Sequence, residues 1–280
     1  FSKLLNEIGF PKGVVNIVHG YGPEVGQAIV EHPDIKAISF TGGTMTGRIV
    51  ASTAAPMFKK LSLELGGKNS TIVLDDADFE SAVPGVARSG FLNSGQICLC
   101  GSRILIHESI YDKFVPLLLE EVSNMDIGPV ISEEHRTKVL SYIELAKQEG
   151  GQILLGGNSI DKPGAWIEPT VIAGLPTNSR TSTEEIFGPV VTLHSFSNDD
   201  EAIEIANSTE YGLAGSVWSK GRGRQIAERI ESGMVWVNTW LHRDLRVPFG
   251  GVKNSGVGRE GGMWSLGFFS EAINICVMEP

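Results

Sequence analysis

The hydrophobic pattern of the first 65 residues switches between two periods. Short β-branched runs predict strands and apolar residues three or four apart predict amphipathic helices. The strands are predicted at 13–18, 35–40 and 59–65, and the helices at 23–32 and 42–54. This alternation is typical of a parallel, doubly wound α/β sheet. A complete nucleotide-binding domain has about twice as many strands, so we expect residues 1–65 to form the C-terminal half of one.

A second α/β unit is predicted from Gly66 onward. Ser109 caps a helix whose Ile110, Phe114 and Leu118 share one face. Further strands are predicted at 70–76, 102–107, 151–157, 166–174, 189–196 and 232–238, and further helices after Asp78 and at 132–146, 199–207 and 222–231. An apolar run at 269–278 predicts one more strand near the C-terminus.

Charge and cysteine content narrow the function classes. The net charge of −10 is spread along the chain, which argues against nucleic acid or an anionic membrane as a partner. The sequence has no run of 18 apolar residues and no leader-like start, so we expect a soluble protein. Its 3 cysteines are an odd number without framework spacing, which favours a reducing compartment and a cytoplasmic location.

Two glycine-rich turns follow predicted strands. The turn at 20–26 has three residues between its second and third glycines where the dinucleotide fingerprint has two, so a tight strand-to-helix turn is the alternative. The turn at 40–47, Phe-Thr-Gly-Gly-Thr-Met-Thr-Gly, opens a helix whose free N–H groups are suited to a diphosphate. Its glycines could equally serve helix packing.

The candidate catalytic groups are a carboxylate and a thiol. Glu64 lies between leucines and before two glycines, where apolar surroundings would raise its pKa as a general base requires. The alternative is a loop glutamate that faces water. Gly95 and Gln96 suggest a loop that presents a cysteine nucleophile, but spacing alone does not choose between Cys98 and Cys100.

Metal binding and serine hydrolase chemistry are disfavoured by spacing. One residue between Cys98 and Cys100 is too few for a zinc knuckle, and the nearest histidine, His107, lies on a predicted strand. We therefore predict no metal. The sequence has neither a Ser-His-Asp order nor a G-x-S-x-G elbow. The histidines without ligand spacing are predicted to be surface or turn residues: His19, His32, His135 and His194.

Taken in order, the motifs of this chain resemble the aldehyde dehydrogenase superfamily over essentially its whole length. They are Phe-Thr-Gly at 40–42, Leu-Glu-Leu-Gly-Gly-Lys at 63–68, Asn-x-Gly-Gln-x-Cys at 93–98, Glu-Glu-Ile-Phe-Gly-Pro at 184–189, Tyr-Gly-Leu at 211–213, Pro-Phe-Gly-Gly-x-Lys-x-Ser-Gly at 248–256 and Gly-x-Gly-Arg-Glu at 256–260. Several such motifs in one order are far more specific than any one of them.

The resemblance implies a fold, a coenzyme and residue roles. It makes Cys98 the nucleophile, Glu64 the general base and Cys100 a neighbour that lines the pocket. It implies NAD as coenzyme, held by Gly42, Gly43, Thr44, Gly47, Leu65, Glu185 and Phe187. Because Gly43 stands where the family usually has serine, we expect coenzyme binding weaker by roughly 1 kcal/mol.

The resemblance also implies three parts and an assembly. Residues 1–65 would be half of a Rossmann-type coenzyme domain and 66–255 the α/β catalytic domain. Residues 256–280 would return to the coenzyme domain and end in an oligomerisation strand. A homodimer or homotetramer is then expected.

Within the superfamily, the segments at 60–69, 97–100 and 240–246 resemble the muconic semialdehyde dehydrogenases, aminomuconic first and hydroxymuconic next. This implies a small aldehyde substrate that carries a carboxylate, 2-aminomuconate semialdehyde in the first place. Arg243 is the first candidate to bind that carboxylate and Arg246 the second, beside Phe249. The alternative is a loop arginine paired with Asp244.

Two departures from the family bear on activity. The oxyanion asparagine and a ribose-binding lysine of the family precede the segment that this chain resembles, and the connection at 124–129 is about ten residues shorter. We therefore expect this chain to correspond to the C-terminal portion of such an enzyme. The alternative function is a truncated, non-catalytic form with a structural or partner-binding role.

Overall fold

The largest sheet of the computed structural model, which describes residues 1–279, has seven strands in the order β10-β9-β3-β4-β7-β6-β5. Every neighbouring pair is parallel except β5 and β6. The strands are β3 (Ser70–Val73), β4 (Arg103–His107), β5 (Gln152–Leu155), β6 (Thr170–Ala173), β7 (Val190–Phe196), β9 (Ala214–Trp218) and β10 (Met234–Val237). The predicted α/β class is confirmed, with an antiparallel edge strand.

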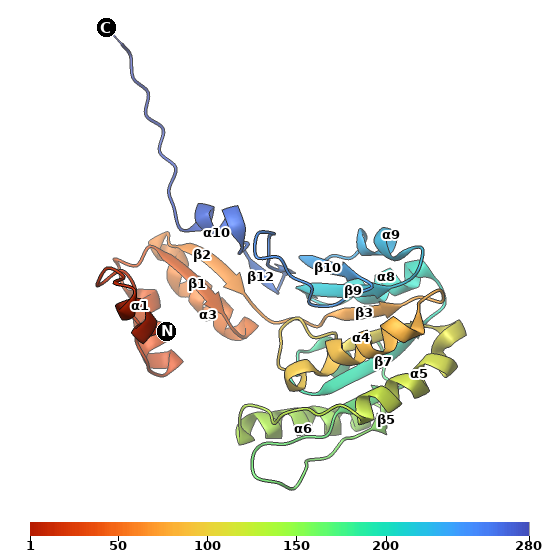
Figure 1. The fold of residues 1–280 in the computed structure, drawn as a ribbon. Helices are drawn as coiled ribbons and strands as arrows, with labels where there is room; N and C mark the ends of the chain where they lie inside the picture. The colour runs from red at the N-terminus through yellow and green to blue at the C-terminus, as the bar shows by residue number, and fades with distance from the viewer. Residues whose placement is uncertain (280) are drawn as a thin grey trace.

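Helices cover both faces of this sheet (Figure 1). Ile104 and Ile106 of β4 pack with α4 (Phe79–Phe91) and α5 (Glu108–Ser123), whereas Leu105 packs with α8 (Asp199–Asn207) and α9 (Gly223–Ala227). Successive residues of a strand point to opposite faces, so an uninterrupted apolar run serves two helix layers. The helix α6 (Glu133–Gln148) packs its Val139 and Ile143 against β6 and β7 residues at the far edge.

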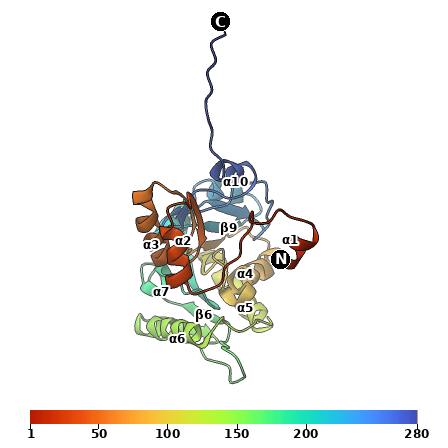
Figure 2. The same cartoon turned by 90° about the vertical axis from the view of Figure 1, so that its left-hand side faces the viewer.

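A smaller sheet has three strands in the order β1-β2-β12. Its strands β1 (Ala37–Thr41) and β2 (Lys60–Glu64) are parallel, and β12 (Gly256–Val257) joins β2 antiparallel, with Gly256 opposite Glu64. The helices α2 (Gln27–Glu31) and α3 (Thr44–Ala54) cover one face, where Val50 and Leu63 share a core (Figure 2). The remaining elements are α1 (Ser2–Glu7), α7 (Arg180–Thr183), α10 (Gly262–Phe268) and the paired β8 (Tyr211–Gly212) and β11 (Val252–Lys253).

Two predicted strands are wrong. Residues 13–18 and 269–278 adopt no strand, and Val14, Val18, Ile275 and Val277 are exposed. A strand requires a neighbour that accepts and donates its backbone hydrogen bonds, and neither segment pairs with another among residues 1–279. The second segment extends away from the sheets after α10 (Figure 1).

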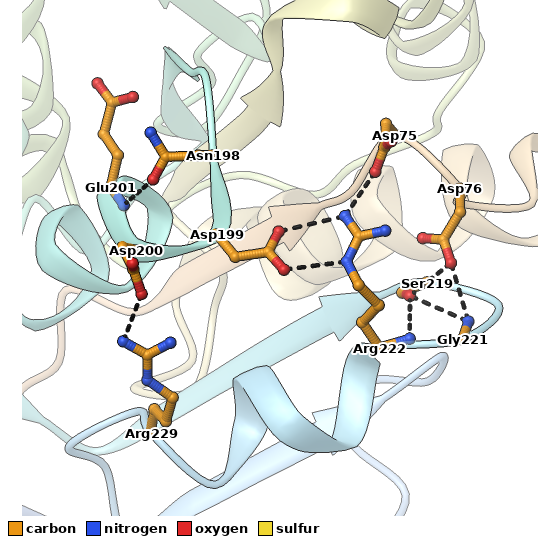
Figure 3. A network of polar contacts seen from close by, with 10 residues as sticks. All are labelled: Asp75, Asp76, Asn198, Asp199, Asp200, Glu201, Ser219, Gly221, Arg222 and Arg229. Atoms are coloured by element: carbon orange, nitrogen blue, oxygen red, sulfur yellow. Dashed lines mark hydrogen bonds and ion pairs between the residues drawn. The ribbon is translucent and has the colours of Figure 1, made fainter.

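One arginine joins three loops beyond the C-terminal ends of strands in the large sheet (Figure 3). Arg222, just before α9, donates to both carboxylate oxygens of Asp199 (3.0 and 3.2 Å) and to Asp75 (2.6 Å). Nearby, Asp76 accepts from the Ser219 hydroxyl (3.0 Å) and the Gly221 N–H (2.9 Å). Because these residues follow β3 and β9 and begin α8, the network sets how the strand ends meet the helices.

Candidate functional site

Glu64 is the last residue of β2 and is 3% exposed. Neither oxygen of its carboxylate has a hydrogen-bond partner among the described residues. Burial raises the pKa of this carboxyl from its ordinary value of 4.5 to about 8, and the charge of Glu260 adds to the rise, while Arg259 and Arg243 oppose it. A carboxyl that titrates near neutral pH can both take and release a proton. The alternative of a loop glutamate that faces water is wrong, because Glu64 is buried at the end of a strand.

Cys98 follows a sharp turn in which three consecutive residues have a positive φ: Asn93 (53°), Ser94 (55°) and Gly95 (70°). A side chain at Gly95 would place its Cβ 2.0 Å from the Gly188 carbonyl oxygen, so only glycine fits this approach. The side-chain amide of Asn69 fixes the loop beyond the turn by donating to the backbone carbonyls of Cys98 (2.7 Å) and Cys100 (2.9 Å).

The two thiols have different surroundings. Cys98 lines a cavity of about 490 Å³, whereas Cys100 is 5% exposed and packs with Leu99 and Trp240. Burial raises the pKa of the Cys98 thiol to about 11, with further contributions from the carboxylates of Glu185 and Glu64. Burial raises the pKa of Cys100 to about 12. The geometry therefore favours Cys98 as the thiol that meets a ligand.

The glycine turn before α3 forms one wall of the same cavity. Gly42 and Gly43 line it, and α3 begins at Thr44, whose hydroxyl is buried without a partner among residues 1–279. Gly47 lies deeper, where an added Cβ would stand 2.5 Å from a methyl of Leu65, which itself lines the cavity. Gly47 therefore supports Leu65 through close helix–strand packing.

Glu185 and Phe187 also line this cavity. A carboxylate oxygen of Glu185 accepts from the Gly67 N–H (3.0 Å), and burial raises its pKa. Phe187 has a φ of 61° and presents a ring that is 37% exposed. This cavity thus brings together a thiol, a helix N-terminus, a carboxylate and an aromatic ring.

The two candidate substrate arginines differ. The guanidinium of Arg243 lies 4.2 Å from the ring centre of Phe249, and both line a second cavity of about 330 Å³. The charge of Arg243 acts on both Glu64 and Cys98. Arg246 is instead exposed and bound to Asp244 through both carboxylate oxygens. Arg246 is thus a loop arginine paired with Asp244, which was the alternative to substrate binding.

Three site residues escaped the sequence reasoning. Asn69 fixes the thiol loop, and Lys138 and His135 of α6 line the large cavity. The expectation that His194 is a surface or turn residue is wrong, because it lies within β7 and is 6% exposed. His135 is half-buried, and its ring reaches the Phe187 carbonyl oxygen at 2.6 Å. Only the i, i+3 spacing of His135 and Lys138 on one helix face signalled a shared role.

Residues 1–279 contain neither a metal-binding cluster nor a membrane-spanning helix. No group of three or more His, Cys, Asp or Glu side chains there could hold a metal ion. No helix in that range is long and apolar enough to cross a membrane.

Comparison with known proteins assigns the family. The model of the aldehyde dehydrogenase family matches residues 1–275. The chain belongs to the aldehyde dehydrogenase family. It is 46% identical to a 2-aminomuconic 6-semialdehyde dehydrogenase of Pseudomonas sp, covering 99% of this chain and 60% of that one. It is 45% identical to the human 2-aminomuconic semialdehyde dehydrogenase, covering 98% and 60%, and 44% identical to a Pseudomonas 2-hydroxymuconic semialdehyde dehydrogenase, covering 99% and 60%.

Solved structures of the family agree with this fold. Betaine aldehyde dehydrogenase from Staphylococcus aureus, crystallised with NAD+, superposes on this aldehyde dehydrogenase chain with a TM-score of 0.91 at 43% identity, covering 95% of this chain and 56% of that one. An aldehyde dehydrogenase from Burkholderia cenocepacia gives a TM-score of 0.94 at 40% identity, covering 96% and 58%. The chain spans about 60% of the length of the curated relatives it matches.

Proposed function

We propose that this protein oxidises an aldehyde to a carboxylic acid with NAD as the hydride acceptor, through a covalent adduct on Cys98. The observation that carries the proposal is a buried carboxyl, Glu64, which has no hydrogen-bond partner among residues 1–279 and whose charge acts on the Cys98 thiol. The two residues come from different elements, and a cavity of about 490 Å³ adjoins the thiol. Family membership gives the reaction class, and the named relatives are dehydrogenases of semialdehydes.

The walls of that cavity fit NAD. The N-terminus of the eleven-residue α3 offers N–H groups to a diphosphate, Gly43 leaves room beside them, and the buried Thr44 hydroxyl still lacks a partner in residues 1–279. Glu185 and Phe187 would meet the nicotinamide ribose and ring. When bound, the nicotinamide supplies a two-electron acceptor for hydride.

The residues of the chain perform the remaining steps. The Cys98 thiol releases its proton to solvent, and its sulfur adds to the aldehyde carbon as the C=O π bond opens to an alkoxide, to which the Cys98 backbone N–H would donate. Loss of hydride leaves a thioester on Cys98. Glu64 then takes a proton from a water molecule as the water oxygen attacks the thioester carbon. The C–S bond breaks, the acid leaves and the sulfur regains a proton from solvent. With a pKa of about 8, Glu64 can return that proton to solvent near neutral pH.

The substrate we propose is 2-aminomuconate semialdehyde, oxidised to 2-aminomuconate. Its carboxylate suits the guanidinium of Arg243, which stacks on Phe249 beside the 330 Å³ cavity. The charge of Arg243 also acts on both Glu64 and Cys98.

NADH formation tests this function directly. The wild-type chain should produce NADH with a muconic semialdehyde, and Cys98→Ala should abolish it. Glu64→Gln should retain a single burst of NADH but lose steady turnover. Arg243→Leu should weaken use of the carboxylate-bearing aldehyde far more than a neutral aldehyde of similar size, with Arg246→Leu as the matched control. An intact, folded chain that forms no NADH would refute the enzymatic proposal.

We propose a homodimer or homotetramer as the assembled form. Ile273, Ile275 and Val277 are 80%, 73% and 80% exposed and recur every second residue, with Asn274 and Cys276 between them, which is the period of a strand that buries one face. Light scattering of the wild type and of Ile275→Asp tests this: a wild-type monomer would refute it. The same exposed segment favours the second candidate function, a non-catalytic partner-binding form, which would assemble without making NADH.

A further inference from the structure

One face of α6 is bound to the loop that carries Glu185 and Phe187. The Tyr142 hydroxyl donates to the Glu184 carboxylate (2.7 Å), the Lys138 ammonium lies 3.5 Å from the Glu185 carbonyl oxygen, and His135 Nε2 lies 2.6 Å from the Phe187 carbonyl oxygen. These side chains are spaced i, i+3 and i+7, so they lie along one stripe of the helix. From the C-terminal to the N-terminal end of this stripe, the side chains contact Glu184, Glu185 and Phe187 in turn.

The apolar contacts of the same face reinforce this alignment. Ile186, which separates Glu185 from Phe187, is 3% exposed and packs with Val139 and Ile143. A Cβ added at Gly188 would stand 2.6 Å from a methyl of Val139. The loop therefore cannot slide along α6 without opening a gap or a clash.

Phe187 is the residue that most needs such support. Its φ of 61° lies in the left-handed region, which costs free energy for a bulky side chain. The ring of His135 packs edge to face on the ring of Phe187, with centroids 6.1 Å apart and an angle of 71°. His135 thus contacts both the carbonyl and the ring of the strained residue.

The segment just before α6 is bound to the turn that presents Cys98. The Ser94 hydroxyl donates to the Gly128 carbonyl (2.7 Å), and the Ile131 N–H donates to the side-chain oxygen of Gln96 (2.8 Å). Ser94 and Gln96 belong to the turn that presents Cys98. Residues 128–142 therefore contact the thiol loop at one end and the Phe187 loop at the other.

We propose that His135 is a positioning residue that fixes the backbone and ring of Phe187 in the cavity wall. The Ser132 hydroxyl caps α6 by accepting from the His135 N–H (3.1 Å), which sets the starting point of the side chain. From there Nε2 donates to the Phe187 carbonyl. The consequence for coenzyme binding rests on the proposed function, whereas the fixing of Phe187 does not.

Hydrogen exchange of the full chain without coenzyme tests the positioning role. In His135→Ala, the amides of residues 184–188 should exchange about fivefold faster, the factor of one hydrogen bond. His135→Gln retains an N–H donor and should restore most of the protection, and His19→Ala, which alters an exposed histidine outside the cavity, should match the wild type. Exchange in β4 reports whether each variant is folded. Unchanged exchange at 184–188 in a folded His135→Ala chain would overturn the proposal.

Kinetics separates this role from general destabilisation. If the wild type reduces NAD, His135→Ala should raise the KM for NAD about fivefold with a much smaller change in kcat and in the KM for the aldehyde. His135→Gln should return the KM for NAD toward the wild type. An unchanged KM for NAD would overturn the link to the coenzyme. A wild type that binds no NAD would defeat the proposed function, while the exchange comparison would still decide whether His135 fixes Phe187.

Discussion

Replacing Glu64 by glutamine should make the stability of the protein less dependent on pH. The pKa of Glu64 is raised from 4.5 to about 8 in the folded state, chiefly by burial. Between these values the folded protein holds one proton more than the unfolded chain, so its free energy of unfolding falls as pH rises, by about 1.4 kcal/mol per pH unit. The full effect has an upper bound of roughly 5 kcal/mol and is reached above pH 8.

Urea unfolding of the wild type and of Glu64→Gln from pH 4.5 to 9 measures this effect. Glutamine carries no titrating proton, so the variant should gain roughly 3 kcal/mol relative to the wild type between pH 4.5 and 7, and the difference should level off above pH 8. Glu204→Gln, on the exposed face of α8, is the matched control and should show no such trend. A difference between the Glu64 variant and the wild type that stays constant with pH would refute the argument from burial.

Three other changes test separate features of the structure. The pKa of the Cys98 thiol is about 11. The rate of its alkylation by iodoacetamide should therefore rise about tenfold per pH unit from pH 7 to 10. A rate that stops rising near pH 8.5 would contradict this prediction. Gly95→Ala should lower the free energy of unfolding by about 2 kcal/mol or more, since its Cβ would meet the Gly188 carbonyl oxygen at 2.0 Å, and an unchanged Tm would count against that clash. Arg222→Ala should lower the free energy of unfolding by up to about 1 kcal/mol. This loss should exceed that of Arg224→Ala, which breaks a single exposed ion pair. Equal losses of stability in thermal unfolding would show that the Arg222 network contributes no more than one ion pair.

The sequence located the catalytic candidates because their signal is local. Glu64 ends an apolar strand and Cys98 follows a glycine-containing turn, and both features are visible within a few residues. The buried strands of the large sheet were predictable for the same reason, since strands covered on both faces are uninterrupted apolar runs. Spacing could not choose between Cys98 and Cys100; the structure separates them because Cys98 lines the large cavity whereas Cys100 is 5% exposed.

The features that the sequence did not reveal depend on distant partners. The run at 13–18 has strand-like residues, but a strand exists only where another strand pairs with it. His135 offered no ligand spacing, because its partner is a backbone carbonyl 52 residues away. The different environments of Arg243 and Arg246 likewise depend on Phe249 and Asp244, and a run of charged residues does not say which of them faces a cavity.

The pairing of β12 with β2 has a consequence for how the chain folds during synthesis. Gly256 closes the free edge of the strand that ends in Glu64, and the Leu65 N–H donates to the Ser255 carbonyl (2.9 Å). At ordinary ribosome speeds, β12 emerges about 10–40 s after β2. Until then β2 has an open edge, so nascent chains offer an apolar strand to chaperones or to neighbouring chains. The surroundings of Glu64 are thus completed among the last elements of the fold, and damage to residues 255–257 should reduce folding yield before it alters chemistry.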